Sequence, residues 1–360
     1  MDTTLMNTTK SNRATLHVEV LEAREVPAVT LPTSPNFAAV GVATTPHYLA
    51  TAQADGGGLV RVFDFKTGTE LFKLRPFGNS YTGGVRVATG DVNGDGTPDI
   101  ICASVVGTGT TVRVFNGINA AEIASFQPFG TKYAGGASVA VADFNGDGKA
   151  DIVAGGGNHN MIKVFNGATV TGTPALLARF APFASTYKGG VRVATGDITR
   201  DGVADIAAVT ARGRAVVEGF SGTTIGNTTP FQPFAPYFAS GANATGGAWI
   251  SVGDVNGDGF ADIATGNGNG KAQVRIIDGK TLPAGGNPTL IRTLVLSPSV
   301  AAVGARVRLV DLNGDGTMEA VVSANTGDQP AVDIYNATTG ALLTAFYASG
   351  TGFLGGIDVG

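Results

Sequence analysis

A nine-residue acidic phrase recurs five times in this chain and constrains the fold more than any other feature. The copies read DVNGDGTPD, DFNGDGKAD, DITRDGVAD, DVNGDGFAD and DLNGDGTME, and they begin at Asp91, Asp143, Asp197, Asp254 and Asp311. Successive copies start 52, 54, 57 and 57 residues apart. Such near-constant spacing is typical of repeat architectures, in which each repeat is one supersecondary unit.

Each acidic phrase lies within a longer unit that contains four short apolar runs. Around the first phrase these runs are GGVRVATG (83–90), DIICASVV (99–106), TVRVFNG (111–117) and EIASFQPF (122–129). They are rich in β-branched residues, end at Gly, Asn or Pro, and show no sustained helical period, so they predict strands joined by hairpins. A unit of about 50 residues with four antiparallel strands is typical of a β-propeller blade.

The third run of three units ends in Asn-Gly or Asp-Gly, at Asn116–Gly117, Asn166–Gly167 and Asp278–Gly279. Such pairs favour tight turns because Gly tolerates positive φ. The sequence therefore predicts tight turns with left-handed glycines at these three places.

The strand count predicts that the two ends of the chain share one blade. Residues 48–77 supply second, third and fourth strands without an acidic phrase before them, and GGIDVG (355–360) supplies a first strand that stops where such a phrase would begin. We therefore expect an all-β, six-bladed propeller of four-stranded antiparallel blades, with residues 37–360 as one domain. This closure removes an open sheet edge. It also explains why six blades carry five acidic loops.

The segments that link one unit to the next also repeat, as in PFGNSYTGG (76–84) and PFGTKYAGG (128–136). Their aromatic residues are predicted to pack between adjacent blades, and an aromatic platform for sugars is the alternative. The residues are Phe77, Phe129 and Phe183 with Tyr81, Tyr133 and Tyr187.

Composition excludes several classes of protein. Charged residues make up 14% and apolar residues 43% of the chain, which argues against a disordered acidic tail or a coiled coil. The net charge of −4 gives no basic excess for nucleic acid, and Cys102 alone cannot form a disulfide framework. No apolar run reaches the ~18 residues of a transmembrane helix. Residues 1–36 are expected to be a flexible, leader-like segment without the apolar stretch of an ordinary secretory signal.

The first acidic loop carries oxygen-bearing residues at alternating positions. Asp91, Asn93, Asp95 and Asp99 occupy positions 1, 3, 5 and 9, and the backbone carbonyl of Thr97 at position 7 can add another ligand. Oxygen ligands in a flexible cage suit Ca²⁺, whereas Mg²⁺, the second choice, demands a tighter octahedron. Three carboxylates this close repel one another without a cation. A metal-free structural role is therefore the weaker alternative.

With these loops and linkers in view, the sequence resembles the FG-GAP family, whose repeats form the propeller of integrin α subunits and of many bacterial surface proteins. The resemblance covers about residues 40–360. It implies one calcium ion in each loop, held by positions 1, 3, 5, 7 and 9. The implied ligands are Asp91, Asn93, Asp95, Thr97 and Asp99; Asp143, Asn145, Asp147, Lys149 and Asp151; Asp197, Thr199, Asp201, Val203 and Asp205; Asp254, Asn256, Asp258, Phe260 and Asp262; and Asp311, Asn313, Asp315, Thr317 and Glu319.

Two loops depart from the pattern. In the third, Thr199 stands at position 3 and Arg200 replaces a glycine, which places a positive charge beside the expected ion and predicts the weakest site. In the fifth, Glu319 stands at position 9, where its longer side chain can still chelate with altered geometry. Five divalent ions would change the net charge from −4 to about +6, so the loaded protein would favour acidic partners such as an anionic polysaccharide.

A separate binding hypothesis concerns the first strands, which line the channel of a propeller. Alignment on the acidic loops places six residues at one equivalent position: Arg86, Ser138, Arg192, Trp249, Arg306 and Asp358. Trp249, the only tryptophan, could act with Arg86, Arg192 and Arg306 to stack on and hydrogen-bond a carboxylated sugar. Structural polar packing between the blades is the alternative.

The sequence offers no recognisable catalytic centre, and we expect that the protein is not an enzyme. The histidines, His17, His47 and His159, lie outside any HExxH motif. The segment GNGNGK (266–271) lacks the Ser or Thr of a phosphate loop, and Ser221 in GFSGT lacks the second Gly of GxSxG.

These features favour a non-catalytic, calcium-binding propeller that acts outside the cell or at its surface as a binding or adhesion scaffold. Its partner would be a protein or a glycan, and we expect a monomer whose export route is open. The location follows from the loops, since extracellular calcium modules work with dissociation constants of about 10⁻⁴–10⁻³ M. The alternatives are a propeller enzyme acting on polysaccharide, as a lyase or a hydrolase, and a purely architectural component of the cell surface.

Overall fold

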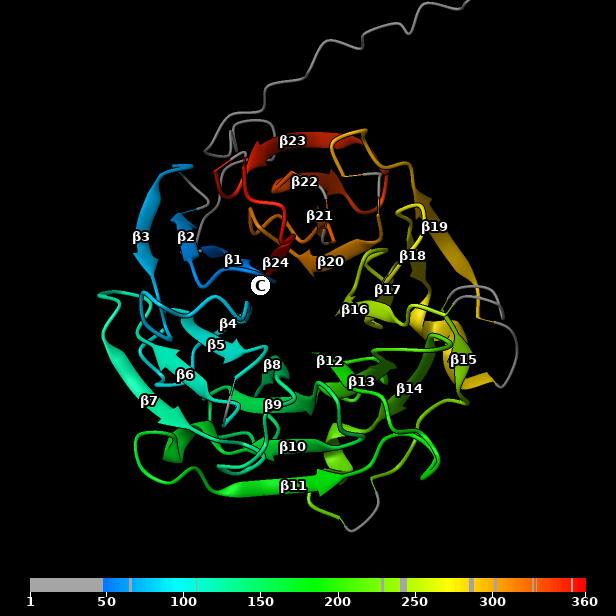
Figure 1. Cartoon of the computed structure of the whole chain (residues 1–360). Coiled ribbons are helices and arrows are strands. Elements are labelled where there is room, and N and C mark those ends of the chain that lie inside the picture. The colour runs from blue at the N-terminus through cyan, green and yellow to red at the C-terminus, as the bar shows by residue number, and fades with distance from the viewer. Residues whose placement is uncertain are drawn as a thin grey trace, which may run out of the picture. The chain divides into compact units, whose positions relative to one another are not determined.

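The computed structural model describes residues 48–360 except 65–66, 108, 228–229, 240–244, 285–287, 301–302, 326, 328 and 351. This part of the chain contains 24 strands in six four-stranded antiparallel sheets arranged around a central axis (Figure 1). The predicted six-bladed propeller is confirmed. The predicted leader segment, residues 1–36, lies outside the described residues, as do residues 37–47.

We number the blades I–VI in ring order and give the strands of each from the innermost outward. Blades I to III consist of β24 (Ile357–Val359), β1 (Tyr48–Gln53), β2 (Val60–Asp64) and β3 (Glu70–Leu74); β4 (Val85–Gly90), β5 (Asp99–Ser104), β6 (Val112–Phe115) and β7 (Glu122–Phe126); and β8 (Ala137–Ala142), β9 (Asp151–Gly156), β10 (Ile162–Phe165) and β11 (Leu176–Phe180). Blades IV to VI consist of β12 (Val191–Gly196), β13 (Asp205–Thr210), β14 (Val216–Phe220) and β15 (Tyr237–Phe238); β16 (Ala248–Gly253), β17 (Asp262–Asn267), β18 (Val274–Ile277) and β19 (Leu290–Leu294); and β20 (Ala305–Val310), β21 (Glu319–Ala324), β22 (Ala331–Asn336) and β23 (Leu342–Tyr347).

The residue pattern of each strand matches its place in the blade. The second strands β5, β9, β13 and β21 are buried along their whole length, as continuous apolar runs predict for strands covered on both faces. The outermost strands β7 and β11 each have a single buried position among exposed and half-buried ones, because one face meets solvent. The first strand of each blade is the innermost one and lies nearest the central axis (Figure 1).

The hydrophobic core consists of six separate clusters, and each cluster lies between two neighbouring blades. Between blades I and II, Ala50 and Val62 pack against Val87 and Ile100. Between blades VI and I, Phe346 meets Phe63 edge to face with ring centroids 5.5 Å apart. Because every blade buries both faces against a neighbour, the ring is stabilised only when it is closed.

The aromatic linkers pack between blades, as predicted. Phe77 and Tyr81 lie with ring centroids 5.1 Å apart, and both pack against the cluster between blades I and II. The Tyr81 hydroxyl donates to the carbonyl of Gly84 at 2.9 Å and accepts from the amide of Val105 at 3.1 Å. The same aromatic pair recurs at Phe129–Tyr133 and Phe183–Tyr187. Their rings are engaged in packing, which leaves the sugar platform without support.

The ring closes through the sheet of blade I, as predicted. Strand β24 pairs with β1 in antiparallel register, with Thr51 opposite Val359 and Gln53 opposite Ile357. Gly360 extends the pairing through two backbone hydrogen bonds with Ala50, at 3.1 and 3.2 Å. The first strand of blade I therefore comes from one end of the chain and its other three strands from the other end.

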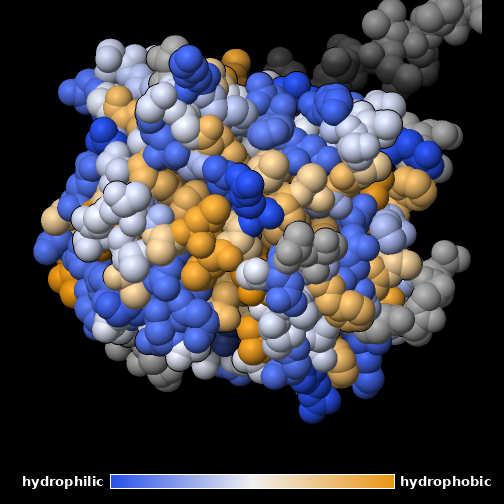
Figure 2. Space-filling view, turned by 90° about the horizontal axis from the view of Figure 1, so that it is seen from below, coloured by the Kyte–Doolittle hydropathy of each residue, from blue (hydrophilic) through white to orange (hydrophobic). Residues whose placement is uncertain are grey.

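The outer wall of the propeller is mixed in character (Figure 2). Hydrophilic residues cover most of the face shown, with hydrophobic residues exposed among them. Around the whole ring, the exposed hydrophobic residues include leucines on outermost strands, such as Leu71, Leu176 and Leu342. In the described residues, no helix is long and apolar enough to cross a membrane.

Candidate functional site

The five acidic loops occupy one rim of the propeller, because each of them joins the first strand of a blade to the second. The loops span residues 91–99, 143–151, 197–205, 254–262 and 311–319, in blades II to VI. Blade I has no such loop, since its first and second strands belong to opposite ends of the chain. Neighbouring loops are also joined: the amide of Ala150 donates to the carbonyl of Asp91 at 2.7 Å, and the amide of Ala261 donates to that of Asp197 at 2.8 Å.

The aspartate at position 1 folds the loop around its own carboxylate. In blade II, Asp91 accepts from the amides of Gly94 and Gly96, each at 2.7 Å. The Asn93 side-chain oxygen accepts from the amide of Asp95 at 2.8 Å. These side-chain-to-backbone bonds are local turns that Asp and Asn favour. They explain why the D-x-N-x-D-G pattern gives the same compact loop in successive blades.

The carboxylate at position 9 is buried at the first residue of the second strand. Asp99, Asp151, Asp205 and Asp262 are 0% exposed, and Glu319 is 1% exposed. One oxygen of Asp99 accepts from the amides of Val92 and Asn93 at 3.0 and 3.1 Å, and the other accepts from Gly117 at 3.2 Å. A buried carboxylate is tolerated only with such partners. Position 9 therefore ties the start of its loop to the end of the third strand.

The glycine that follows the third strand has a role other than the predicted one. Gly117, Gly167 and Gly279 do not have positive φ, so the expectation of left-handed glycines was wrong there. A Cβ on Gly117 would instead lie 1.9 Å from the carbonyl oxygen of Pro98. Only glycine lets this backbone come close enough for its amide to reach Asp99. The same bond recurs from Gly222 to Asp205, in a unit whose third strand is followed by Ser221 and Gly222.

Burial and crowding of like charges disfavour the ionised form of the position 9 carboxyls. Burial raises the pKa of Asp99 to about 6, against opposing hydrogen bonds, and the Asp95 carboxylate adds to the rise. Burial raises the pKa of Glu319 to about 8, with Asp315 and Asp311 acting in the same direction. A cation held by the loop would relieve both effects, since it neutralises the buried charge and the repulsion.

The loop of blade IV differs from the others at two positions, as its sequence indicated. Arg200 adopts φ +59°, a left-handed conformation that is strained for a residue with a side chain. Its guanidinium extends to the neighbouring loop. It lies 5.5 Å from the ring centroid of Phe260 and packs against Gly259, both in the loop of blade V. The positive charge that the sequence predicted beside the third site thus also reaches the fourth loop, and the weakness of the third site stays a prediction.

The loop of blade VI carries two linked changes. Glu319 replaces the aspartate at position 9, and Ala337 stands where blades II to V have glycine. The amide of Ala337 donates to the carbonyl of Met318 at 3.0 Å instead of to the carboxylate. Glu319 still accepts from Leu312 at 2.9 Å. The longer acid and the bulkier residue thus occur together, which a comparison of the two positions in the sequence could have revealed.

The donor chemistry of the loops fits a hard cation such as Ca²⁺, because carboxylate, amide and backbone oxygens are all that they offer. Among the described residues, however, no three or more His, Cys, Asp or Glu side chains are grouped so that they could hold a metal ion. The carboxylates at positions 1 and 9 are turned to backbone amides instead. The structure thus brings the predicted ligands into one small loop in each of five blades, without showing a closed coordination shell.

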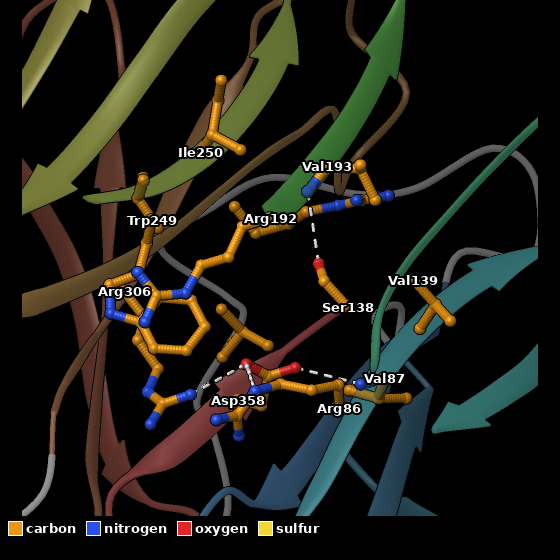
Figure 3. Close-up of a pocket in the computed structure, with 13 residues that line it drawn as sticks. Arg86, Val87, Ser138, Val139, Arg192, Val193, Trp249, Ile250, Arg306 and Asp358 are labelled. Atoms are coloured by element: carbon orange, nitrogen blue, oxygen red, sulfur yellow. Dashed lines mark hydrogen bonds and ion pairs between the residues drawn. The ribbon is translucent and has the colours of Figure 1, made fainter. Parts of the chain in front are cut away.

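The predicted channel residues come together at one cavity of about 50 Å³ (Figure 3). Arg86, Ser138, Arg192, Trp249, Arg306 and Asp358 all line it, one from the first strand of each blade. Each is the second residue of its strand and the acidic loop follows the last one, so this cavity lies toward the opposite rim from the loops. The sequence did not indicate that Asp55, on the turn after β1, also contacts this group through Arg306.

His159, the one histidine among the described residues, lies on the surface. Its ring is 6.4 Å from that of Phe129 and 6.0 Å from that of Tyr133, between ring centroids. Its exposed position between two aromatic rings fits a loop residue that contributes to packing.

Comparisons with known proteins agree with the repeats and the fold. An FG-GAP-like repeat model matches residues 91–154 and 143–208, and an FG-GAP repeat model matches residues 246–279. The chain therefore carries FG-GAP repeats, which often bind Ca²⁺ and which here form a β-propeller. No curated protein sequence matches it.

Among solved structures, a protein of unknown function from Bacteroides caccae is similar, with a TM-score of 0.54 and 10% identity over 88% of this chain and 99% of that one. Rhamnogalacturonan lyase PL11 of Bacillus licheniformis aligns with a TM-score of 0.42 and 15% identity over 85% of this chain, and an exotype rhamnogalacturonan lyase aligns with 0.43 and 15% over 85%. The alignments cover 66% and 62% of those lyases. At these identities the likeness to the Bacteroides protein concerns the fold alone.

Proposed function

We propose that this protein is a non-catalytic binding scaffold of the cell surface or extracellular space, stabilised by calcium in its five acidic loops. The observation that carries the proposal is the repetition of one loop in five blades. In each loop the position 9 carboxylate is buried and the position 1 carboxylate is wrapped by backbone amides. A buried acid surrounded by further acids is costly unless a cation compensates it.

Calcium suits this role better than a transition metal. The side chains at positions 1, 3, 5 and 9 offer oxygens only, and histidine and cysteine are absent from all five loops. Oxygen ligands in an irregular, adaptable loop are typical of Ca²⁺ sites. Extracellular calcium is abundant enough to fill weak sites, which supports a location outside the cell.

A binding role fits the remaining chemistry better than catalysis does. Hydrolases and lyases need a positioned acid and base, and the described loops present carboxylates that are engaged with backbone amides. The propeller instead offers a rigid ring with two rims and a central channel. We expect a protein or glycan partner, and a monomer, since each sheet is complete within one chain.

The test measures calcium binding and ligand binding separately. Chelator-treated protein is titrated with CaCl₂ by isothermal titration calorimetry, and melting is followed with and without calcium. A glycan array run in calcium and in EGTA then tests the binding role. Calcium binding with sugar recognition supports the proposal, turnover of a sugar polymer would replace it with an enzymatic role, and the absence of calcium binding would overturn it.

A further inference from the structure

The cavity at the channel mouth has the features of an anion site. Three guanidinium groups surround the ring of Trp249, with distances to its centroid of 3.6 Å for Arg192, 3.9 Å for Arg306 and 4.9 Å for Arg86. Arg308 lines the same cavity. Four cationic side chains from three blades (II, IV and VI) are thus brought within one small space.

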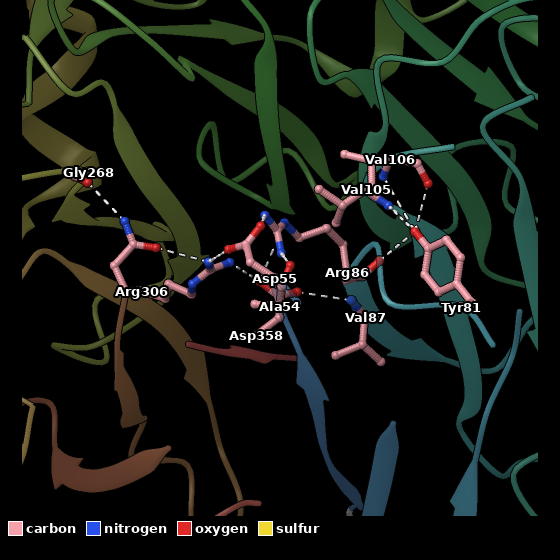
Figure 4. Close-up of polar contacts among 12 residues, drawn as sticks. Ala54, Asp55, Tyr81, Arg86, Val87, Val105, Val106, Gly268, Arg306 and Asp358 are labelled. Atoms are coloured by element: carbon pink, nitrogen blue, oxygen red, sulfur yellow. Dashed lines mark hydrogen bonds and ion pairs between the residues drawn. The ribbon is translucent and has the colours of Figure 1, made fainter. Parts of the chain in front are cut away.

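The carboxylates in this group are too few to balance its cations. Asp358 accepts from Arg306 Nη1 at 3.1 Å, and Asp55 accepts from Arg306 Nη2 at 3.0 Å (Figure 4). Arg86 is only loosely paired with the same two acids, at 3.8 and 4.0 Å. Two carboxylates therefore face four arginines, and the excess of about two positive charges is concentrated in a space with little solvent.

Arg192, like Arg308, is a cation that this pairing leaves out. Its Nη1 donates to the carbonyl of Ala248 at 2.6 Å, and it forms no ion pair with any residue in the described part of the chain. Burial lowers its pKa to about 9, and Arg86 and Arg306 act in the same direction, so it keeps its charge at neutral pH. A charged guanidinium that is partly buried without a counterion is costly.

Trp249 provides a second, independent indication of a missing partner. It is 8% exposed, and its Nε1–H is a buried donor that finds no hydrogen-bond acceptor among the residues described. The Nε atoms of Arg306 and Arg308 are likewise buried without a hydrogen-bond acceptor among the residues described. Buried donors are nearly always satisfied in folded proteins, so several around one cavity point to a ligand that accepts hydrogen bonds.

A wider cavity of about 300 Å³ shares Arg86, Ser138 and Arg192 with the inner one. Arg212 and Asp55 also line it. A ligand could therefore place an anionic end group beside Arg192 and leave a body the size of a monosaccharide in the wider space. The faces of Trp249 are occupied by guanidinium groups, so this ligand would be recognised by charge and hydrogen bonds and not by stacking on the indole.

We propose that the channel mouth of this propeller binds an oxyanion, either a free inorganic ion or the carboxylate of a sugar acid, through Arg192 with Arg86 and the Trp249 Nε1–H. The proposal deepens the binding role proposed above by naming the chemistry of a ligand. It does not depend on the acidic loops, since about five residues of strand, or roughly 16 Å, separate Arg86 from Asp91.

The chain offers a built-in probe for the test, because Trp249 is its only tryptophan. Tryptophan emission of the calcium-loaded, full-length protein is followed during titration with sodium glucuronate, sodium sulfate and glucose. We expect saturable changes with glucuronate or sulfate, weakened by added NaCl, and none with glucose. A saturable change with sulfate but none with glucuronate would assign the site to a free inorganic ion. No saturable change with either anion, or an equal change with glucose, would overturn the proposal.

Ser138 allows a matched pair of variants. The Ser138 hydroxyl accepts from the amide of Val193 at 3.3 Å, just as Asp358 accepts from Val87 at 2.9 Å in blade I. Ser138→Asp can therefore keep this bond while it adds the carboxylate that Arg192 lacks. We expect it to weaken anion binding at least about tenfold, and Ser138→Ala to change it less than about threefold. Equal affinity of Ser138→Asp and the parent would contradict the proposal.

The two proposals fail in different ways. A protein that binds the anion but neither binds calcium nor changes its melting in EGTA would refute the calcium scaffold alone. A protein that binds calcium normally but leaves Trp249 emission unaffected by both anions would refute the channel site alone.

Discussion

Blade I and the other five blades reach the same four-stranded sheet in different ways. In blades II to VI, the first and second strands are joined by an acidic loop whose position 9 carboxylate is buried. In blade I, β24 is held by three register pairs with β1 and by its contacts with neighbouring blades. Those contacts include the pair between Asp358 and the 2% exposed Arg306. The difference shows that the loop is not needed to build a blade, and its retention in five blades points to a separate purpose.

The largest effect is expected from removing β24 by deletion of residues 355–360. The deletion removes the buried side chains of Ile357 and Val359 from the core. It also removes the carbonyl of Ile357, to which the Ser323 hydroxyl donates a hydrogen bond. Loss of Asp358 leaves Arg306 with one carboxylate fewer, and breaking a buried ion pair alone costs about 3–5 kcal/mol. We expect a large fall in melting temperature or loss of the folded ring, measured by circular dichroism and size-exclusion chromatography.

Asp358→Asn provides the control for this deletion, because it keeps β24 and removes only the charge. It should melt between the deletion variant and the parent. A deletion variant that melts like the parent would show that blade I does not close the ring.

Calcium removal should act on the five looped blades and leave blade I intact. An ion that binds only the folded protein stabilises it by about 2.7 kcal/mol per site at a concentration of 100 times its Kd. We therefore expect EGTA to lower the melting temperature substantially and calcium to restore it. Unchanged melting after removal of metal verified by elemental analysis would argue for loops that are structural without an ion.

A single looped blade can be tested through Asp99→Ala. The change leaves the amides of Val92, Asn93 and Gly117 without their buried acceptor, at a cost of about 1–3 kcal/mol each before water enters. We expect a loss of about 3 kcal/mol or more in urea unfolding. Glu122→Ala in the same blade removes an exposed ion pair with Arg113 and should cost less than about 1 kcal/mol. Equal effects would mean that position 9 has no special role.

The smallest of these effects is expected from Gly117→Ala. Its Cβ would collide with the Pro98 carbonyl, so the backbone must move away from Asp99, and overpacking of this kind costs about 1–3 kcal/mol. Gly350→Ala is the control, because its Cβ would meet nothing within 4 Å. Melting temperatures compare the two. If they are equal, close approach at Gly117 is not what stabilises the loop.

The sequence was sufficient to predict the blades, their number and the closure. These features depend on local patterns that repeat: apolar runs, turn residues and the acidic phrase. The closure followed from counting strands, because residues 48–77 lack a first strand and residues 355–360 supply only a first strand. The common position of Arg86, Arg192, Trp249 and Arg306 followed from the same register.

What the sequence could not provide depends on tertiary contacts, either within a blade or between blades. The direction of Arg200 toward the loop of blade V is set by the packing of Phe260, about sixty residues away. The role of Gly117 depends on how closely its backbone approaches Pro98, which no local propensity encodes. The sequence also did not indicate that Asp55 pairs with Arg306, on another blade, and not with Arg192.

The most direct test of the account counts calcium ions and locates them. Crystals grown in calcium should show anomalous density in the loops of blades II to VI and none in blade I, and calorimetry of the chelated protein should give a stoichiometry near five. Loops that bind no ion at millimolar calcium, in a protein that is folded and stable in EGTA, would contradict it.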